Sequence, residues 1–268
     1  MNEVLSDSKT YIEVFKEITQ IKAFFATKNS SKPGWPFYNE ELFAEVGLAD
    51  AVHVGHWQTH SDNVQIITQE MVDRCRAGDF VLEYPDDIEE KKKFTSEEYN
   101  GGGILFLDSD GAITDIPGVL LTSMHADCIP LFFYDPVKQV IAMVHSGWKG
   151  TVKEIGRITS EKMQSVYGCK ASDILVHIGP GISKCCFQVD KDVYEMFRDP
   201  SFTTKGIKYY IDLKHYNKRM LMETGITEEH ITVSDHCTCC ETDLFDSYRR
   251  DGSKQRMGGG ICILPVVE

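Results

Sequence analysis

The sequence predicts an α+β fold built on mixed β-sheets. Short apolar segments with strand-like content recur along the 268-residue chain and outnumber the segments with helical spacing. The long segments also do not alternate strictly between strand and helix, as a parallel βαβ fold would require.

The first predicted strands enclose a polar turn. Residues 51–57 and 64–68 have strand-like apolar content, and the turn Thr-His-Ser-Asp-Asn at 59–63 lies between them. His60 is therefore predicted where a strand becomes a loop. Three further strands are predicted at residues 118–124, 131–134 and 140–144.

A helix is predicted after the strand at 140–144. That strand runs into His-Ser-Gly-Trp-Lys-Gly at 145–150, and Thr151 with Glu154 then forms a capping-box pattern. Apolar residues follow at helical spacing as far as Gly168. The remaining predicted elements are strands at 174–178, 231–234 and 260–264 and helices at 190–197 and 211–224.

The chain is expected to be a single domain over residues 1–268, because it contains no internal repeat and no linker rich in proline or serine. Residues 86–103 stand apart. They carry a run of acidic and basic residues and end in three glycines. We expect this segment to be a surface insertion rather than a site.

Charge and hydropathy exclude several classes of protein. There are 28 Lys and Arg against 41 Asp and Glu, which gives a net charge of -13 and makes a nucleic-acid partner a poor expectation. No apolar run approaches the roughly 18 residues of a membrane span, and residues 1–20 lack the pattern of a signal peptide. We therefore expect a cytoplasmic protein without a membrane partner, whose nine cysteines are reduced.

Three potential metal ligands each follow an apolar strand. These are His60, Cys128 and His145. Two imidazoles and one thiolate suit zinc and leave the fourth tetrahedral position open, which is the pattern of a catalytic rather than a structural zinc site. From spacing alone the metal site is a weak inference, because a histidine at such a junction is more often a hydrogen-bonded structural residue than a ligand and a buried cysteine is usually inert.

Several motifs in the sequence resemble those of the YfiH/laccase-domain family. The residues that carry the resemblance begin at about Val52 and continue to the C-terminus: Ala-Asp-Cys-Ile-Pro at 126–130, His-Ser-Gly-Trp-Lys-Gly at 145–150, Ile-Gly-Pro-Gly-Ile at 178–182, Cys-Phe-Gln-Val at 186–189 and Phe-Asp-Ser-Tyr-Arg-Arg-Asp-Gly at 245–252. Members of this family are bacterial zinc-dependent purine nucleoside phosphorylases, formerly described as polyphenol oxidases.

The resemblance implies a fold, an activity and a metal site. The implied fold is a layered α/β/β/α sandwich with mixed sheets, and the implied activity is phosphorolysis of purine nucleosides, with adenosine deamination as a further activity. The implied metal ligands are His60 after Gln58, Cys128 and His145. Copper could enter the same site. The small-molecule partners would be a nucleoside and phosphate.

The chain departs from the family pattern in three places. The family's N-terminal motif, Thr-Arg followed by a glycine-containing loop, appears here only as Ala-Thr-Lys at 26–28, without the glycines. Residues 86–103 resemble an insertion relative to the family. Phe187-Gln188 stands where the family usually has Tyr-Glu. These departures bear on substrate preference more than on the metal ligands.

Phosphorolysis needs positive charge and directed N–H groups beside the reacting sugar. Lys149, Arg249 and Arg250 are the candidates for the charge, and Gly150 lies in a turn that would present N–H groups at a helix N-terminus. Asp127 is predicted to be either a proton carrier or an anchor that orients a metal-binding imidazole.

Other functions and sites were weighed against this hypothesis. His145 could activate Cys128 as the nucleophile of a metal-free hydrolase acting on a cell-wall precursor. A copper polyphenol oxidase would need several copper centres, which one Cys and two His do not supply. A second metal site at Cys237 and Cys240 is not expected, because Cys185 and Cys186 are neighbours whose side chains should diverge in an extended chain.

Overall fold

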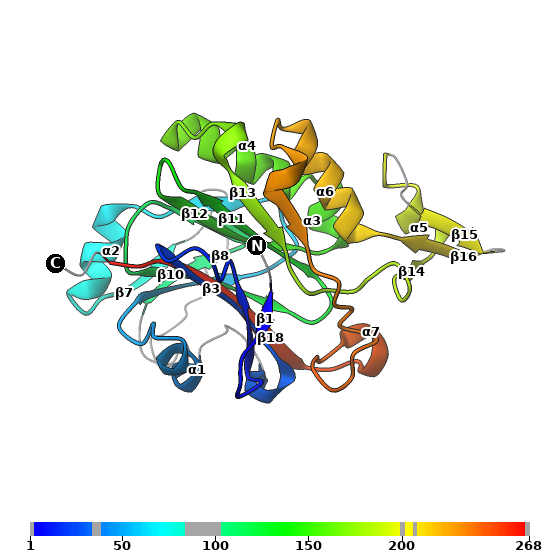
Figure 1. Cartoon of the computed structure of the whole chain (residues 1–268), viewed down its shortest axis with the longest axis horizontal. Coiled ribbons are helices and arrows are strands. Elements are labelled where there is room, and N and C mark those ends of the chain that lie inside the picture. Colours follow the sequence, from blue (N-terminus) through cyan, green and yellow to red (C-terminus); the bar gives the residue numbers. More distant parts are fainter. Residues whose placement is uncertain (1–2, 34–38, 84–102, 199–201, 206–207, 266–268) are drawn as a thin grey trace.

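The computed structural model describes residues 3–33, 39–83, 103–198, 202–205 and 208–265 (Figure 1). Two large sheets face each other, and helices cover the outer side of each. This α/β/β/α layering confirms the fold expected from the sequence. The predicted insertion at 86–103 lies outside the described residues, apart from Gly103.

The first sheet has nine strands in the order β1-β2-β3-β18-β10-β5-β8-β7, with β4 also paired to β18. Both parallel and antiparallel pairs occur, since β10 runs parallel to β5 and antiparallel to β18. The strand bounds are β1 Val4–Leu5, β2 Tyr11–Val14, β3 Ile21–Ala26, β4 Lys32–Pro33, β5 Val52–Trp57, β7 Phe80–Glu83, β8 Gly103–Leu107, β10 Val119–His125 and β18 Gln255–Ile263.

The second sheet has six strands in the order β17-β13-β11-β12-β9-β6. Its central pair is an antiparallel hairpin in which Pro130 faces His145. The strand bounds are β6 Val64–Ile66, β9 Gly111–Thr114, β11 Ile129–Asp135, β12 Val140–Ser146, β13 Leu175–Ile178 and β17 Ile231–Val233.

Side-chain alternation along the central hairpin builds two cores. Phe132 and Met143 pack into the core between the sheets, whereas Leu131 and Val144 pack into a second core that also contains residues of α4 and α6. Every residue of β11 and β12 is buried. These strands therefore read as continuous apolar runs rather than as alternating ones.

Helices α3, α4 and α6 cover the second sheet, while α1 and α2 pack against the first (Figure 1). A small third sheet, ordered β14-β16-β15, extends to one side together with α5. The remaining bounds are α1 Glu40–Glu45, α2 Gln69–Arg76, α3 Trp148–Val152, α4 Ile155–Tyr167, α5 Lys191–Tyr194, α6 Leu213–Glu223, α7 Tyr248–Asp251, β14 Gln188–Val189, β15 Phe202–Lys205 and β16 Lys208–Ile211. Single 3-10 turns occur at Lys28–Ser30, Ala171–Asp173 and Glu228–His230.

The capping box predicted at Thr151 and Glu154 is wrong. The helix α3 starts earlier, at Trp148, and ends at Val152, with Lys153 as its C-cap. Glu154 then adopts a left-handed conformation with φ of 61° before α4 begins. The Thr151 hydroxyl hydrogen-bonds Ser146 instead of capping a helix, so the polar pattern marks a break between two helices.

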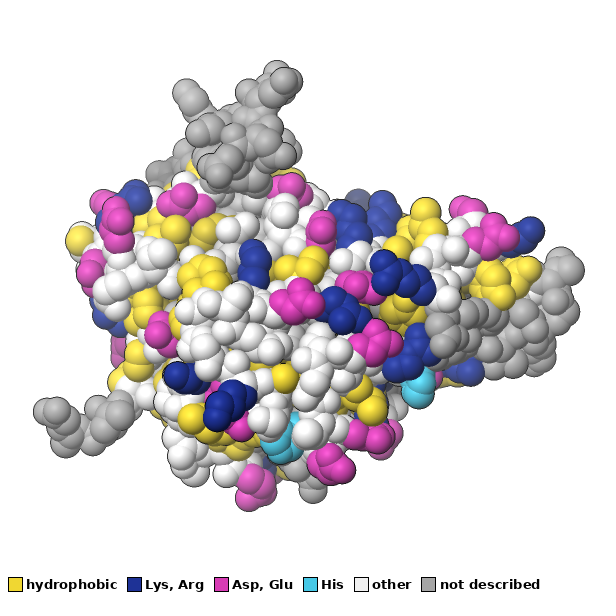
Figure 2. Space-filling view, turned by 90° about the horizontal axis from the view of Figure 1, so that it is seen from above, with side chains coloured by type: hydrophobic (Ala, Val, Ile, Leu, Met, Phe, Trp, Pro, Cys, Tyr) yellow, Lys and Arg dark blue, Asp and Glu magenta, His cyan; other side chains and the backbone are white. Residues whose placement is uncertain are grey.

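The visible surface carries both signs of charge. On the face seen from above in Figure 1, basic and acidic side chains are intermingled (Figure 2). This distribution differs from the basic face typical of nucleic-acid-binding proteins. Among the described residues, no helix combines the length and the apolar character that crossing a membrane requires.

Candidate metal centre and its pocket

Two loops and the end of a strand bring His60, Cys128 and His145 together. His60 lies in the turn after β5, Cys128 in the short connection between β10 and β11, and His145 near the end of β12. One potential ligand atom from each residue lies within 4.8 Å of the other two, and the Cys128 Sγ lies 3.8 Å from the His60 Nε2. The residues predicted to be metal ligands are therefore grouped around a common centre.

The turn that carries His60 is fixed on both sides. The Gln58 side-chain amide donates to the Met124 carbonyl, and the Met124 N–H donates back to the Gln58 Oε1, at 3.0 and 2.7 Å. These two bonds fasten the turn to β10. His60 itself has a φ of 60°, a left-handed conformation that a histidine adopts only where its surroundings hold it.

Asp110 fixes both histidines. Its buried carboxylate accepts hydrogen bonds from the backbone N–H groups of Thr59, His60 and Ser61, and it also accepts from the Nδ1 of His145 at 2.8 Å. This arrangement leaves the Nε2 of His145 as the available ligand atom. A carboxylate that orients a ligating imidazole is a common feature of zinc sites.

Sequence reasoning missed Asp110. Although burial opposes its ionisation, hydrogen bonds from His145 and Ser61 outweigh that cost and lower the pKa of Asp110 to about 2. The sequence signal that could have identified Asp110 was the polar Asp-Ser-Asp motif at 108–110, which lies between two apolar strands, β8 and β9.

Gly147 leaves the space that the ligands occupy. A Cβ atom at this position would lie 2.7 Å from the His60 Cδ2 and 2.9 Å from the Cys128 Sγ. Both approaches are closer than real Cβ atoms show. The glycine of the His-x-Gly-Trp word is thus needed for two of the three ligands to converge.

Charges within the group favour a thiolate beside an imidazolium. Burial alone would raise the pKa of Cys128, but His145 and His60 outweigh it and lower the pKa to about 6. Burial likewise opposes the charge of His145, yet Cys128 and Asp110 raise its pKa to about 10. A thiolate and two imidazoles match the ligand preferences of zinc, and His145 would release its proton when the ion binds, so the residues present fit such an ion.

The three residues open onto a pocket of about 770 Å³. Aromatic and cationic side chains line it beside the potential ligands. Its lining residues are Trp57, Gln58, His60, Met124, Ala126, Cys128, His145, Tyr248, Lys254 and Arg256. The pocket is large enough for a small organic molecule, and most of its surface is apolar.

Comparison with known proteins identifies the family. The family model described as multi-copper polyphenol oxidoreductase laccase matches residues 38–264. The chain belongs to this family. A crystal structure of the protein YfiH from Bacillus licheniformis superposes with a TM-score of 0.77 at 28% identity, covering 97% of this chain and 98% of that one.

Two curated relatives of this laccase-family chain carry enzyme names. The purine nucleoside phosphorylase YlmD of Bacillus subtilis is 42% identical over 153 residues, which are 54% of this chain and 55% of the relative. The adenosine deaminase RL5 of an unknown prokaryotic organism is 32% identical over 151 residues, which are 53% and 57% of the two chains. The aligned part of the chain thus spans little more than half the length of these relatives.

The residues predicted to bind phosphate do not line this pocket. Lys149 places its ammonium 5.6 Å from the Trp148 ring, and Gly150 is buried next to the His145 carbonyl. Arg249 donates to the Gln188 carbonyl at 2.7 Å, and Arg250 donates to the carbonyls of Thr238, Cys239 and Phe245.

The cations that line the pocket are instead Lys254 and Arg256. In the sequence they follow the Phe-Asp-Ser-Tyr-Arg-Arg motif, which was the one nearby feature that could have drawn attention to them. Lys28, at the position where the family pattern has an arginine, donates to the Thr242 carbonyl at 2.7 Å and does not line this pocket.

Asp127 is turned toward the chain segments behind the pocket. Its carboxylate accepts from the hydroxyls of Thr238 and Ser247 and from the backbone N–H of Arg249, at 2.7, 3.0 and 2.6 Å. These bonds make Asp127 an anchor of the segments that carry Thr238 and Ser247 rather than of a metal-binding imidazole, since the carboxylate on His145 is that of Asp110. Its role as a proton carrier stays a prediction.

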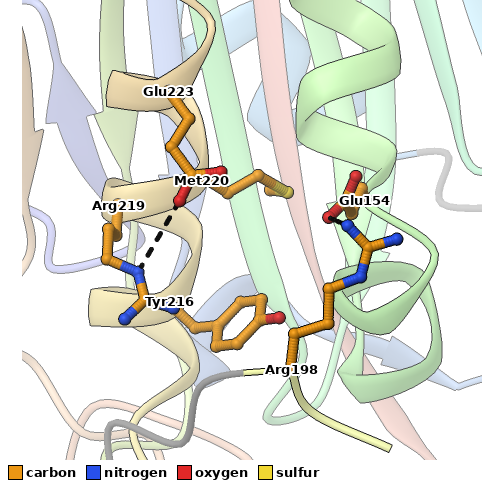
Figure 3. Close-up of a pocket in the computed structure, with 6 residues that line it drawn as sticks. All are labelled: Glu154, Arg198, Tyr216, Arg219, Met220 and Glu223. Carbon is orange, nitrogen blue, oxygen red and sulfur yellow. Dashed lines mark ion pairs between the residues drawn. The ribbon is translucent and has the colours of Figure 1, made fainter.

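Another pocket, of about 230 Å³, lies between the start of α4 and α6 (Figure 3). Its charged side chains pair with each other: Arg198 contacts Glu154 at 3.2 Å and Arg219 contacts Glu223 at 4.0 Å. Because these charges are mutually satisfied on an open surface, we assign no chemistry to this pocket.

The expectation that the side chains of Cys185 and Cys186 diverge is wrong. Residues 183–187 form a turn rather than an extended segment, since the N–H groups of Cys186 and Phe187 both donate to the Ser183 carbonyl at 3.0 Å. The two sulfurs lie 3.7 Å apart and join Cys237 and Cys240 in a second group that could hold a metal ion.

Proposed function

We propose that the chain is a zinc-dependent purine nucleoside phosphorylase. It would convert adenosine or inosine and phosphate to the free base and ribose 1-phosphate, with deamination of adenosine as a second activity. The observation that carries this proposal is the convergence of His60, Cys128 and His145 in a pocket that also presents cationic and aromatic side chains. The names of the relatives support the same substrate class.

His60, Cys128 and His145 would hold the zinc ion through two imidazole nitrogens and one thiolate. Bound zinc supplies a Lewis acid with one open position for an oxygen of phosphate or water. Asp110 would keep the His145 ring in place through its Nδ1, and Gly147 would keep the ligand space clear.

The remaining pocket residues would bind the two substrates. Lys254 and the half-buried Arg256 can neutralise phosphate, and guanidinium groups bind its oxygens well. Tyr248, which is 64% exposed, and Trp57 offer aromatic surface for a purine ring. Holding phosphate beside the sugar would convert a bimolecular encounter into a reaction between oriented groups.

An assay with and without phosphate tests the proposal. The metal-replete protein should release adenine and ribose 1-phosphate from adenosine, and release should stop when phosphate is omitted. Continued release of adenine with free ribose would indicate hydrolysis instead. Failure of the metal-replete protein to cleave any purine nucleoside would refute the proposal.

Two matched variants locate the phosphate. Arg256→Gln should raise the KM for phosphate by about tenfold or more, as loss of a charge-assisted contact implies. Lys149→Gln, whose cation lies outside the pocket lining, should leave that KM within about twofold. The reverse result would place phosphate on the α3 side, as the sequence predicted.

One observation favours a second candidate function. Asp110, His145 and Cys128 form a carboxylate, imidazole and thiolate series of the kind that activates nucleophilic cysteines. A metal-free hydrolase of cell-wall precursors would use this series directly. Its activity would survive chelation and be abolished by alkylation of Cys128, whereas the phosphorylase would lose activity under both treatments.

A further inference from the structure

Four cysteines from two distant loops form a compact cluster of sulfurs. Cys185 and Cys186 lie in the turn before β14, and Cys237 and Cys240 lie in the segment after β17. All four sulfurs fall within 4.8 Å of one another. Cys237 is buried, Cys186 is half-buried, and Cys185 and Cys240 are exposed at the surface.

Local backbone hydrogen bonds shape both halves of the cluster. The turn at Ser183 brings Cys185 and Cys186 to the same side, as described above. In the second segment, the Cys240 N–H donates to the Cys237 carbonyl at 3.1 Å, which gives the C-x-x-C pair a tight turn. An isolated β-bridge between Gly181 and Cys237 then joins the two segments.

The sulfur separations match a four-coordinate metal better than disulfides. Four of them are 3.3, 3.5, 3.7 and 3.7 Å. A disulfide would bring two sulfurs to about 2.05 Å. Zinc–sulfur bonds of about 2.3 Å in a regular tetrahedron place the sulfurs roughly 3.8 Å apart. The cluster is therefore close to the size of a tetrahedral thiolate cage.

We propose that Cys185, Cys186, Cys237 and Cys240 bind one zinc ion in a closed, four-thiolate structural site. Zinc accepts four thiolates and is redox-inactive, and the C-x-x-C spacing of Cys237 and Cys240 is typical of such sites. This site is separate from the group of His60, Cys128 and His145 and does not rest on the proposed function.

The surroundings can compensate the negative charge of four thiolates around zinc. The Ser183 N–H donates to the Cys237 Sγ at 3.4 Å. Arg249 donates to the Cys186 carbonyl at 3.2 Å, and Arg250 donates to the Cys239 carbonyl at 3.1 Å. Lys214 donates to the carbonyls of Ser234 and His236, next to the cluster. N–H donors and nearby cations of this kind support thiolate ligands.

The zinc ion would hold together the loops that lie behind the pocket of His60, Cys128 and His145. Next to Cys237, Thr238 donates to Asp127, which immediately precedes Cys128 in sequence. Because the same carboxylate accepts from the Arg249 N–H, the clamp also reaches the segment that begins α7. Loss of this zinc should loosen the loops without removing a ligand from the other site.

Metal analysis of the full chain tests the proposal. Cys185→Ser combined with Cys240→Ser should reduce the zinc content by about one equivalent. Cys239→Ser is the matched control, because Cys239 lies in the same loop but outside the cluster, and it should retain the full content. Loss of zinc from the control and not from the double variant would overturn the ligand assignment.

Cobalt substitution in a variant that keeps all four cysteines covers the case in which the double variant does not fold. When the His60, Cys128 and His145 group is removed by His60→Ala and Cys128→Ser, bound cobalt should still give the intense sulfur-to-cobalt absorption of a four-thiolate tetrahedral site. Absence of that absorption, bound iron with its own visible colour, or disulfides among the four cysteines in protein purified under reducing conditions would each refute a zinc site.

Discussion

Asp110 connects the two histidines of the candidate metal centre through one carboxylate. It reaches His60 through backbone N–H groups and His145 through the imidazole ring. The metal geometry should therefore depend on a residue that contributes no ligand atom. Such supporting carboxylates are as informative about a site as the ligands themselves.

Replacing this carboxylate tests its positioning role. Asp110→Asn should weaken zinc binding by about 10- to 100-fold, because an amide supports the backbone N–H groups and the His145 ring less well than an anion does. Affinity is measured by competition with a chromogenic chelator. The exposed Asp115→Asn serves as the control and should bind zinc as the unaltered chain does. Equal affinity in both variants would contradict the role assigned to Asp110.

The Cys128 thiolate predicts an unusual pH dependence in the metal-free protein. An ordinary cysteine has a pKa of roughly 8.5, whereas His145 and His60 lower the pKa of Cys128 to about 6 despite its burial. Because the thiolate is the reactive form, alkylation of Cys128 should stay fast from pH 8 down to pH 6 and decline as the pH falls further.

Peptide mass spectrometry can follow Cys128 separately from the other cysteines. In His145→Ala the midpoint should move upward, since the neighbouring positive charge is lost. Zinc should protect the thiol in the unaltered chain. A midpoint near that of an ordinary cysteine would contradict the charge arrangement described here.

The residues of the centre were only partly predictable from sequence. His60, Cys128 and His145 could be selected because each follows an apolar strand and stands in a family word. Asp110 and Arg256 could not be selected, because their roles depend on backbone N–H groups and pocket walls supplied by distant segments. Lys149 was predicted near the pocket because it stands in the His-Ser-Gly-Trp-Lys-Gly motif beside His145, but its side chain lies by Trp148.

At the scale of elements, the turn between β12 and α3 determines whether the ligands can meet. Gly147 caps α3 without a side-chain hydrogen bond and lies against both His60 and Cys128. The strand and the following helix were predictable from apolar periodicity. The break at the left-handed Glu154 was not, because the same polar pattern also fits a capping box at the start of one helix.

A methyl group added to this turn should disturb the centre selectively. Gly147→Ala should lose most bound metal and most activity, because its Cβ would displace His60 or Cys128. In Gly150→Ala, three residues further on within α3, the added Cβ would meet the Ile155 Cγ2 at 3.4 Å, an ordinary contact, and the variant should keep its metal. Metal content per folded chain, with folding checked by circular dichroism, distinguishes the two. Full metal occupancy in Gly147→Ala would contradict the packing described.

At the scale of the whole molecule, the two sheets create the interface at whose edge the pocket lies. The strands nearest the sequence words were predictable, yet β1, β2 and β3 were not, and β3 pairs directly with the C-terminal β18. Strand partners so distant in sequence are selected by packing between the sheets rather than by local pattern. The glycines of β18 lie where large aromatic side chains approach.

The packing on the face of the first sheet that α1 covers can be tested at Gly260. A side chain there would meet the Phe24 ring, which packs on Phe43 of α1, at 2.6 Å, so Gly260→Val should lower the free energy of unfolding by about 1–3 kcal/mol through overpacking. Val233→Ala, at a partly exposed strand position, should change it by no more than about 0.5 kcal/mol. Urea denaturation measures both. Equal stability of the two variants would show that this face packs more loosely than described.

Anomalous X-ray diffraction at the zinc absorption edge tests the central claim most directly. We predict a peak within bonding distance of the His60 Nε2, the Cys128 Sγ and the His145 Nε2 in crystals grown from protein supplied with zinc. A fully zinc-loaded crystal without density between these three atoms would contradict the account of the metal centre.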